Sequence, residues 1–230
     1  MSSGHEDARR TGTPNRALAS VWPPFALRVT SGDLELHQVT DDDIPQLVEL
    51  ARAGIHDPST MPFFFPWTDA PADRLGPNTA AYYWQMRSTF GPAAWALDLA
   101  VRVDGDLVGV QGVGTRNFPV TRTGETGSWL TRSRQGQGIG TRMRQAICAL
   151  LFDHLGATEI TSGAFTDNPA SLAVSRKVGY VEDGTIRLQR REGELAHNRR
   201  LVLTPERFVR GAPVAVEGAT ELRRFVGLDD

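Results

Sequence analysis

The chain has 230 residues, of which 40% are hydrophobic and 23% charged, and its formal net charge is −2. This balance is typical of a soluble globular protein and argues against nucleic acid as a partner. No apolar run approaches the ~20 residues of a membrane-spanning helix, and the N-terminus lacks the apolar stretch of a secretory signal. We therefore expect a cytoplasmic protein with no membrane partner. A single cysteine, Cys148, cannot form an internal disulfide or a cysteine metal cluster, and its helical context indicates a buried structural thiol.

The first residues of the chain differ in composition from the rest. Residues 1–24 are polar and punctuated by proline, so we expect a flexible N-terminal tail before a domain that spans 25–204. Alternating apolar and polar residues predict a half-buried strand over 33–39. A helical repeat of apolar residues comes next, over 41–55.

A proline-rich and aromatic stretch at 56–77 is too irregular for a regular element and too apolar for a simple linker. We expect a second helix over 78–90 and a strand over 95–103. Asp104-Gly105 then favours a tight hairpin turn into another strand at 107–117.

The second half of the chain also contains both strands and helices. Expected elements are a strand at 125–131, a helix over about 138–155, a buried strand at 158–165, a helix at 168–180 and a hairpin over 185–204. Residues 205–230 are poorly patterned and are expected to form a C-terminal extension. Strands intermixed with helices, joined by hairpins and crossovers, indicate an α/β domain with a mixed sheet.

The helix over 138–155 carries one apolar stripe, which predicts packing on a sheet. Its members are Ile139, Met143, Ala146, Ile147, Leu150 and Leu151. We expect Arg142, Arg144 and Gln145 to lie away from that stripe.

Three glycines, Gly136, Gly138 and Gly140, stand between the strand and this helix. The first N–H groups of a helix have no intrahelical partner, and the helix dipole favours an anion there, so a phosphate group is the natural ligand. The spacing does not match the dinucleotide fingerprint, and the lysine of the nucleotide phosphate loop is missing. A nucleotide-binding protein is therefore disfavoured.

The motif Gln135-x-x-Gly138-x-Gly140 resembles the Q/R-x-x-G-x-G/A signature of the GNAT acyltransferases. "NPASLAVSRKVGY" at 168–180 is similar to the second signature of that family, and "ETGSWL" at 125–130 resembles the E-x-G-x-W-L strand of its branch of ribosomal-protein and antibiotic N-acetyltransferases. The three motifs occur in the family's order, and the resemblance covers roughly residues 30–204.

The resemblance implies the GNAT fold, a central mixed sheet flanked by helices, with acetyl-CoA or another acyl-CoA as cosubstrate and no metal. Loop residues that it implies for the pyrophosphate are Gln135, Gly136, Gln137, Gly138, Ile139, Gly140 and Thr141. Main-chain groups of Leu130, Thr131 and Arg132 would hold the pantetheine arm. Asn168 would cap its helix, contact the coenzyme, or do both.

The same resemblance implies direct attack of a primary amine on the thioester, with a base for the amine and an acid for the thiolate. Glu125 is the leading candidate for the base, and Asp98 is a second carboxylate. Many relatives place a tyrosine acid at the position of Ser175, so this chain departs from the pattern. Ser171 and Ser175 are candidates for the acid, and Ser171 also for contact with the coenzyme.

Acceptor binding is predicted for the aromatic stretch, with His56, Phe65 and Trp67 as candidates; packing of that stretch in the core is the alternative. The acceptor would be a protein N-terminus, a lysine or a small amine, and the acyl group acetyl, with succinyl as another possibility. A non-catalytic acyl-CoA-binding module is the alternative function. The chain is also a candidate homodimer or higher homo-oligomer.

Overall fold

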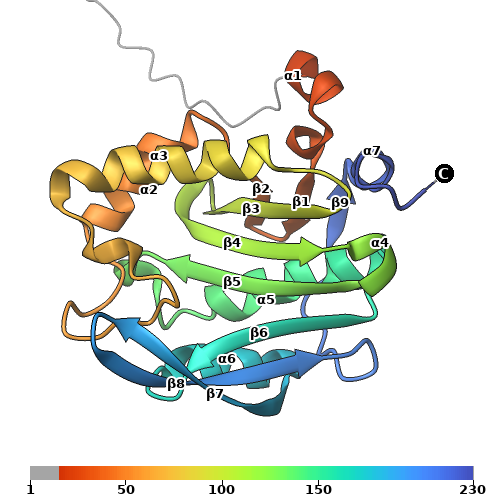
Figure 1. Ribbon diagram of the computed structural model, residues 1–230. Helices are drawn as coiled ribbons and strands as arrows, with labels where there is room; N and C mark the ends of the chain where they lie inside the picture. The colour runs from red at the N-terminus through yellow and green to blue at the C-terminus, as the bar shows by residue number, and fades with distance from the viewer. Residues whose placement is uncertain (1–15, 230) are drawn as a thin grey trace, which may run out of the picture.

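The computed structural model describes residues 16–229 and is built around one nine-stranded sheet with the strand order β7-β8-β6-β5-β4-β3-β2-β1-β9 (Figure 1). Neighbouring strands are antiparallel except β5 and β6, which run parallel. The strands are β1 (Arg28–Ser31), β2 (Leu34–Gln38), β3 (Ala94–Val103), β4 (Asp106–Arg116), β5 (Thr123–Leu130), β6 (Glu159–Phe165), β7 (Val181–Arg191), β8 (Glu194–Leu203) and β9 (Ala215–Glu217). The expected mixed-sheet α/β fold is confirmed.

Helices cover both faces of the sheet. They are α1 (Arg16–Val21), α2 (Asp43–Arg52), α3 (Ala72–Ser88), α4 (Phe118–Thr121), α5 (Ile139–Ala149), α6 (Pro169–Val178) and α7 (Ala219–Phe225). Figure 1 shows α2 and α3 on one face and α5 and α6 on the other. The larger apolar core lies under α5, while α2 and α3 enclose a smaller one. In the part of the chain that the structure describes, no helix has both the length and the apolar character to cross a bilayer.

The hairpin between β3 and β4 forms as predicted. Asp104 and Gly105 both have positive φ, 51° and 86°, which is the backbone of the two-residue turn that matches the twist of paired strands. The expected helix over 78–90 is present but begins earlier, at Ala72, and it contains Pro77. Pro77 has no N–H to donate, yet the helix continues through it because Leu75 and Tyr83 are buried on its inner side.

The apolar stripe of α5 is buried as predicted, but Arg144 is not on the outside of the helix. Its side chain is 4% exposed and donates to Gln111 Oε1 at 3.4 Å, Ser162 Oγ at 3.1 Å and Ser128 Oγ at 3.1 Å. Oxygen atoms from three strands replace the water that a guanidinium would otherwise need. The expectation for Arg144 was therefore wrong.

Both ends of the described chain pack onto the same edge of the sheet. Residues 1–15 of the predicted tail lie outside the described residues, but Trp22 makes edge-to-face contacts with Phe90 and Phe225. In the segment that we expected to be an extension, β9 pairs with β1, and Leu222 and Val226 are fully buried. Residues beyond 204 thus complete the sheet and its core.

Candidate functional site

The two parallel strands separate halfway along their length. β5 pairs with β6 only from Thr123–Glu159 to Thr126–Ser162. Beyond this point β5 stays paired with β4 up to Leu130, while β6 stays paired with β8 up to Phe165. A wedge therefore opens in the sheet at the C-terminal ends of two parallel strands, a usual place for ligands in α/β folds.

One edge of the wedge carries free main-chain groups. The Thr131 amide donates to Val108 O of the β4 side at 2.9 Å. Successive main-chain N–H groups of a strand point to opposite sides, so those of Ser128 and Leu130 point toward the wedge. The ladder with β6 ends before them, which leaves their N–H groups without a strand partner. The Arg132 amide donates to Gly54 O at 3.2 Å and is therefore not available to a ligand. Of the three residues predicted to line the pantetheine arm, Leu130 alone keeps its amide available.

The glycine loop leads from this edge to α5. Gly136 and Gly138 have φ of 74° and 80°, which glycine adopts without strain. Within residues 16–229, five successive amides, those of 136 to 140, donate to no acceptor. Gly138 is the N-cap of α5 and offers no capping side chain. Successive free amides at a helix N-terminus form an anion-binding concavity.

Other loop residues hold this concavity in shape. The Gln135 side chain donates to Ile55 O at 2.7 Å and to Leu130 O at 2.9 Å, so it ties the loop to two other segments. Ile139 is buried in the main core, and a Cβ at Gly140 would lie 3.4 Å from Val174 on α6. The Thr141 amide donates to Gly138 O. Gln137 is exposed and its side chain donates to Ser133 O at 2.9 Å.

Helix α6 borders the wedge and carries the predicted serines. Asn168 caps it, because its side-chain oxygen accepts from the Ser171 amide at 3.1 Å. The Ser171 side chain is partly exposed. Ser175 is 1% exposed and its hydroxyl has no hydrogen-bond partner among the described residues. A buried hydroxyl without a partner is unusual in a folded protein.

The face of the sheet under α3 is hollow next to the wedge. In register across β3, β4 and β5 lie the rows Asp98–Gly112–Gly127 and Ala96–Gly114–Glu125. A Cβ built on Gly114 or Gly127 meets no atom within 4 Å. The resulting cavity has a volume of about 840 Å³ and is walled by α3 and the aromatic stretch.

Asp98 lies on the floor of this cavity. Its side chain is 9% exposed and leans over the neighbouring strand, since a Cβ on Gly112 would lie 2.9 Å from its Oδ1 atom. Oδ2 has no hydrogen-bond partner among the described residues. Burial raises the pKa of Asp98 to about 6, partly offset by the nearby Tyr82 hydroxyl. The sequence indicated a special role for Asp98 only through its position as an acidic residue inside an otherwise apolar strand.

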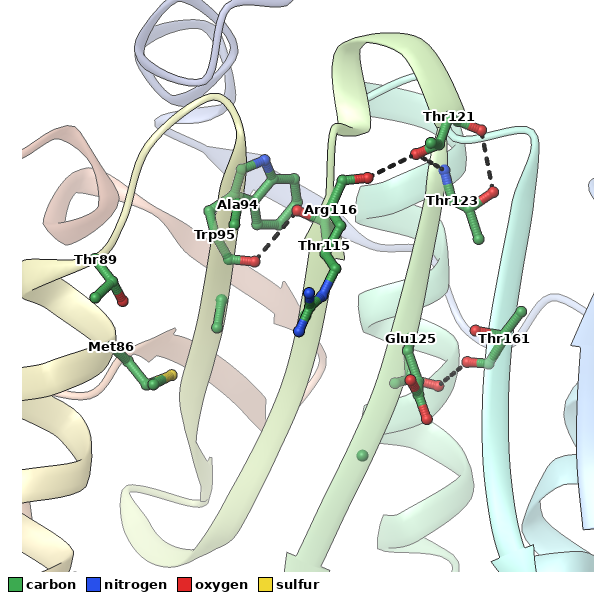
Figure 2. A pocket seen from close by; sticks show the side chains of 14 residues that line it. Met86, Thr89, Ala94, Trp95, Thr115, Arg116, Thr121, Thr123, Glu125 and Thr161 are labelled. Carbon is green, nitrogen blue, oxygen red and sulfur yellow. Dashed lines mark hydrogen bonds between the residues drawn. The ribbon is translucent and has the colours of Figure 1, made fainter. Parts of the chain in front are cut away.

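Glu125 stands across Gly114 from β3 and is exposed. It lines both the first cavity and an adjoining one of about 830 Å³ that extends toward Thr121. Figure 2 shows Glu125 on β5 and Met86 on α3 reaching this second hollow from two sides. The structure thus brings Glu125 and Asp98 to one cavity floor.

The aromatic stretch forms one wall of the first cavity. Phe65 and Trp67 line it, as does Trp129 of β5, whose ring centroid lies 5.8 Å from that of Trp67. His56 does not line it: one ring nitrogen bonds Asp57 O and the other Thr68 Oγ1, both at 2.8 Å. Tyr82 and Tyr83 of α3 also line the cavity. Both lie in the helix expected over 78–90, but sequence reasoning missed them because the face of this helix that meets the sheet is set by contacts distant in sequence.

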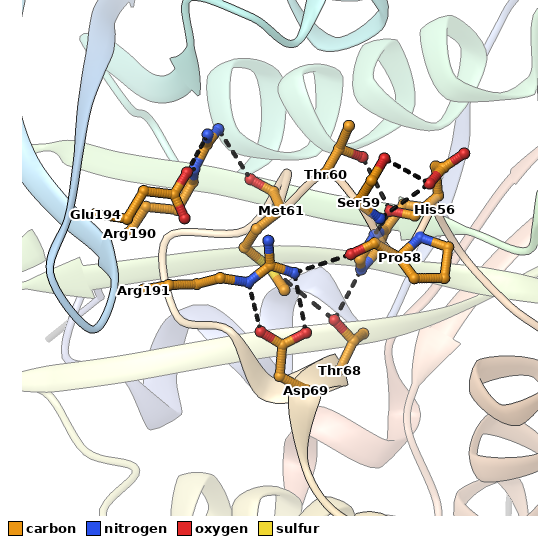
Figure 3. A network of polar contacts seen from close by, with 11 residues as sticks. His56, Pro58, Ser59, Thr60, Met61, Thr68, Asp69, Arg190, Arg191 and Glu194 are labelled. Carbon is orange, nitrogen blue, oxygen red and sulfur yellow. Dashed lines mark hydrogen bonds and ion pairs between the residues drawn. The ribbon is translucent and has the colours of Figure 1, made fainter.

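An arginine clasp, formed by Arg190 and Arg191 at the end of β7, holds the aromatic stretch across the wedge (Figure 3). Arg191 binds Asp69 through two hydrogen bonds, 2.7 and 3.1 Å, and donates to Pro58 O at 3.2 Å. Arg190 donates to Met61 O at 3.5 Å. The wall of the cavity is therefore attached to the far half of the sheet.

Two further observations limit the chemistry. Within residues 16–229, no three histidine, cysteine, aspartate or glutamate side chains are grouped as a metal site requires. Cys148 is fully buried, and burial raises the pKa of its thiol to about 11. A thiol in that state is a poor nucleophile, as expected for a structural cysteine.

Known proteins share this architecture. The model of the acetyltransferase (GNAT) domain family matches residues 33–181. The chain is 27% identical over 92 residues to YdaF of Bacillus subtilis, provisionally named a ribosomal N-acetyltransferase; the match spans 40% of this chain and about half, 49%, of that protein.

Solved structures agree in fold. RimJ of Mycobacterium smegmatis, in complex with a CoA disulfide, has a TM-score of 0.70 at 19% identity and covers 88% of this chain and 95% of its own. An acetyltransferase of Salmonella typhimurium that modifies the N-terminal serine of ribosomal protein L7/L12 has a TM-score of 0.60 at 18% identity, covering 76% and 96%. With its family match and this fold, the chain belongs to the acetyltransferase (GNAT) domain family.

Proposed function

We propose that the protein transfers an acetyl group from acetyl-CoA to a primary amine by direct attack. The observation that carries the proposal is the wedge between β5 and β6, which has an anion-binding loop at its mouth and a carboxylate-bearing cavity beside it. One side of the wedge suits a phosphate-bearing donor and the other a cationic acceptor. Family membership supports the same division.

The residues present fit the donor. Five free amides at the N-terminus of α5 suit a pyrophosphate, and the dipole of that helix adds to the attraction. The free N–H groups of Ser128 and Leu130 suit an amide-bearing arm and a thioester carbonyl in the wedge. Asn168 and Ser171 stay candidates for contact with the donor.

The acceptor requires loss of a proton before its nitrogen can attack. In the net reaction the C–N bond forms and the C–S bond breaks; one proton reaches the thiolate sulfur and one leaves to solvent. Glu125 and Asp98 are the carboxylates that can take a proton in the cavity. Ser175 and Ser171 are the proposed proton donors to the sulfur atom. They would replace the tyrosine that many relatives have at the position of Ser175.

The experiment has two parts. Thermal-shift measurements against acetyl-, succinyl- and malonyl-CoA identify the acyl group, because at equal concentration the ligand with the lowest Kd stabilises the folded state most. We expect acetyl-CoA to raise Tm, and release of free thiol to depend on added amine. Binding of acetyl-CoA with no amine-dependent thiol release would favour the non-catalytic module instead, the alternative that Ser175 in the acid position supports.

The nature of the acyl group, the cytoplasmic location and a homo-oligomeric state stay predictions. Light scattering of the purified protein tests the last of these.

A further inference from the structure

Asp98 is a buried carboxylate without a counterion. No arginine, lysine or histidine among residues 16–229 pairs with it, and its Oδ2 atom makes no hydrogen bond. An unpaired carboxylate 91% removed from solvent destabilises a fold, because burial disfavours its charge. The Asp98 side chain lines a cavity of about 840 Å³, which indicates that a cationic ligand is the missing partner.

The strand register determines what can reach it. Gly112 and Gly127 follow Asp98 across β4 and β5, so no side chain separates the carboxylate from the wedge. Strands lie about 4.8 Å apart, so the row from Asp98 to Gly127 is roughly 10 Å long. Because the Asp98 carboxylate leans over Gly112, an ammonium group bound to it would lie about one strand spacing from Gly127, where β5 has parted from β6.

The walls above this floor are aromatic. Phe65 and Trp67 from the loop, Trp129 from β5, and Tyr82 and Tyr83 from α3 surround the space. Aromatic faces bind apolar surface and also attract cations. Glu125 lines the same cavity and would repel an anionic acceptor, whereas the charge of Asp69 is offset by Arg191.

From these contacts we infer that Asp98 binds the acceptor's ammonium group, takes a proton from it, and selects primary amines with an apolar or aromatic body and no carboxylate beside the amine. This inference rests on the proposed transfer reaction. The proton passes from the ammonium nitrogen to a carboxylate oxygen of Asp98 and from there to solvent. The amine that remains supplies the electron pair of the new C–N bond.

The pH dependence follows from the position of Asp98. Its pKa of about 6 in the fold lies above the ordinary value of 3.8. A carboxyl group with a raised pKa contributes stability below its ordinary pKa and loses it as the pH rises through 6. Replacing Asp98 by asparagine should therefore raise Tm at pH 8 relative to wild type, with no such gain at pH 4.

The test compares three acceptors that share a phenylethylamine body: 2-phenylethylamine, L-phenylalaninamide and L-phenylalanine, of which the last two are matched in size. We expect kcat/KM for the first two to exceed that for L-phenylalanine by about 100-fold, since the carboxylates of Asp98 and Glu125 repel the carboxylate of L-phenylalanine. Spermidine, a polar polycation, should also be a poorer acceptor than 2-phenylethylamine. Equal rates for L-phenylalanine, or a preference for spermidine, would overturn the substrate class.

Asp98→Asn tests the residue itself. We expect it to lower kcat/KM for 2-phenylethylamine about 100-fold, to remove the rise of kcat/KM through pH 6, and to leave the affinity for acetyl-CoA unchanged. Glu125→Gln, the matched control on the same floor, should keep the rise through pH 6. An Asp98→Asn variant that keeps the wild-type pH profile, or is less stable at pH 8, contradicts the inference. Failure of wild-type protein to acetylate any amine would instead overturn the proposed function.

Discussion

Glycine residues serve two distinct purposes in the site. Gly136 and Gly138 adopt positive φ and turn successive amides outward, so their contribution is a backbone shape. Gly112 and Gly127 lie in extended strands: the space over Gly112 holds the Asp98 carboxylate, and the space over Gly127 is empty. The first pair suits the phosphate end of the donor, and the second pair clears the path between Asp98 and the wedge.

Gly138→Asp tests the anion-binding loop. The carboxylate would repel a pyrophosphate and disturb at least two amide hydrogen bonds to it, which is worth about 3 kcal/mol, or roughly a 100-fold rise in Kd for acetyl-CoA. Calorimetric titration measures this directly. Gly105→Asp is the matched control, because Gly105 also has positive φ and no atom within 4 Å of its built Cβ. Both variants should lose similar stability, and equal Kd values for the two would remove the loop from the binding site.

At the scale of single residues, a role could be predicted from sequence only where the residues that define it lie close together in the chain. The loop could be predicted because its glycine spacing and the helix after it are contiguous in sequence. The surroundings of Asp98 and Arg144 could not be predicted from neighbouring residues in the sequence. The partners of Arg144 come from three strands, and the cavity at Asp98 depends on the register of β3, β4 and β5. Register over such distances is set by the whole sheet.

At the level of elements, the site joins two halves of the sheet that are separately paired. β4 and β5 provide one side of the wedge, while β6, β8 and β7 provide the other. The arginine clasp connects these halves through the aromatic stretch. The strands and most helices were predictable from periodicity, but this connection was not, since Arg191 and Asp69 are far apart in sequence.

Arg191→Ala tests the clasp. The Arg191–Asp69 pair is partly exposed but ties the aromatic stretch to β7, so we expect its loss to loosen the cavity wall and raise the KM for the amine by at most about 5-fold. The KM for acetyl-CoA should not change, because the anion-binding loop is intact. Arg200→Ala, which removes the exposed Arg200–Asp183 pair on the same hairpin, serves as control. Parallel increases of both KM values would mean that the aromatic stretch does not act on the acceptor alone.

On the scale of the whole molecule, the sheet edge far from the site is finished by the ends of the described chain. β9 covers β1, and α7 brings Leu222 and Val226 into the main core. Weak periodicity beyond residue 204 hid this from sequence analysis, because a three-residue strand and a seven-residue helix carry too few apolar positions to form a pattern.

Leu222→Ala tests the structural role of this segment. Removing a fully buried leucine should lower the free energy of unfolding by about 2–5 kcal/mol, and urea denaturation measures it. Leu195→Ala, at a residue that is 53% exposed, should change it by less than about 0.5 kcal/mol. Similar values for the two variants would show that residues after 204 are not part of the cooperative core.

We propose above that an acetyl group passes from acetyl-CoA to an amine within the wedge. The most direct test of this transfer follows free CoA thiol and N-acetylated product, the latter by mass spectrometry, in one reaction with 2-phenylethylamine and a panel of other primary amines. We expect equal molar amounts of thiol and N-acetyl product for at least one amine, and neither with Gly138→Asp. Thiol release without any N-acetylated amine, or no release despite tight binding of acetyl-CoA, would contradict it.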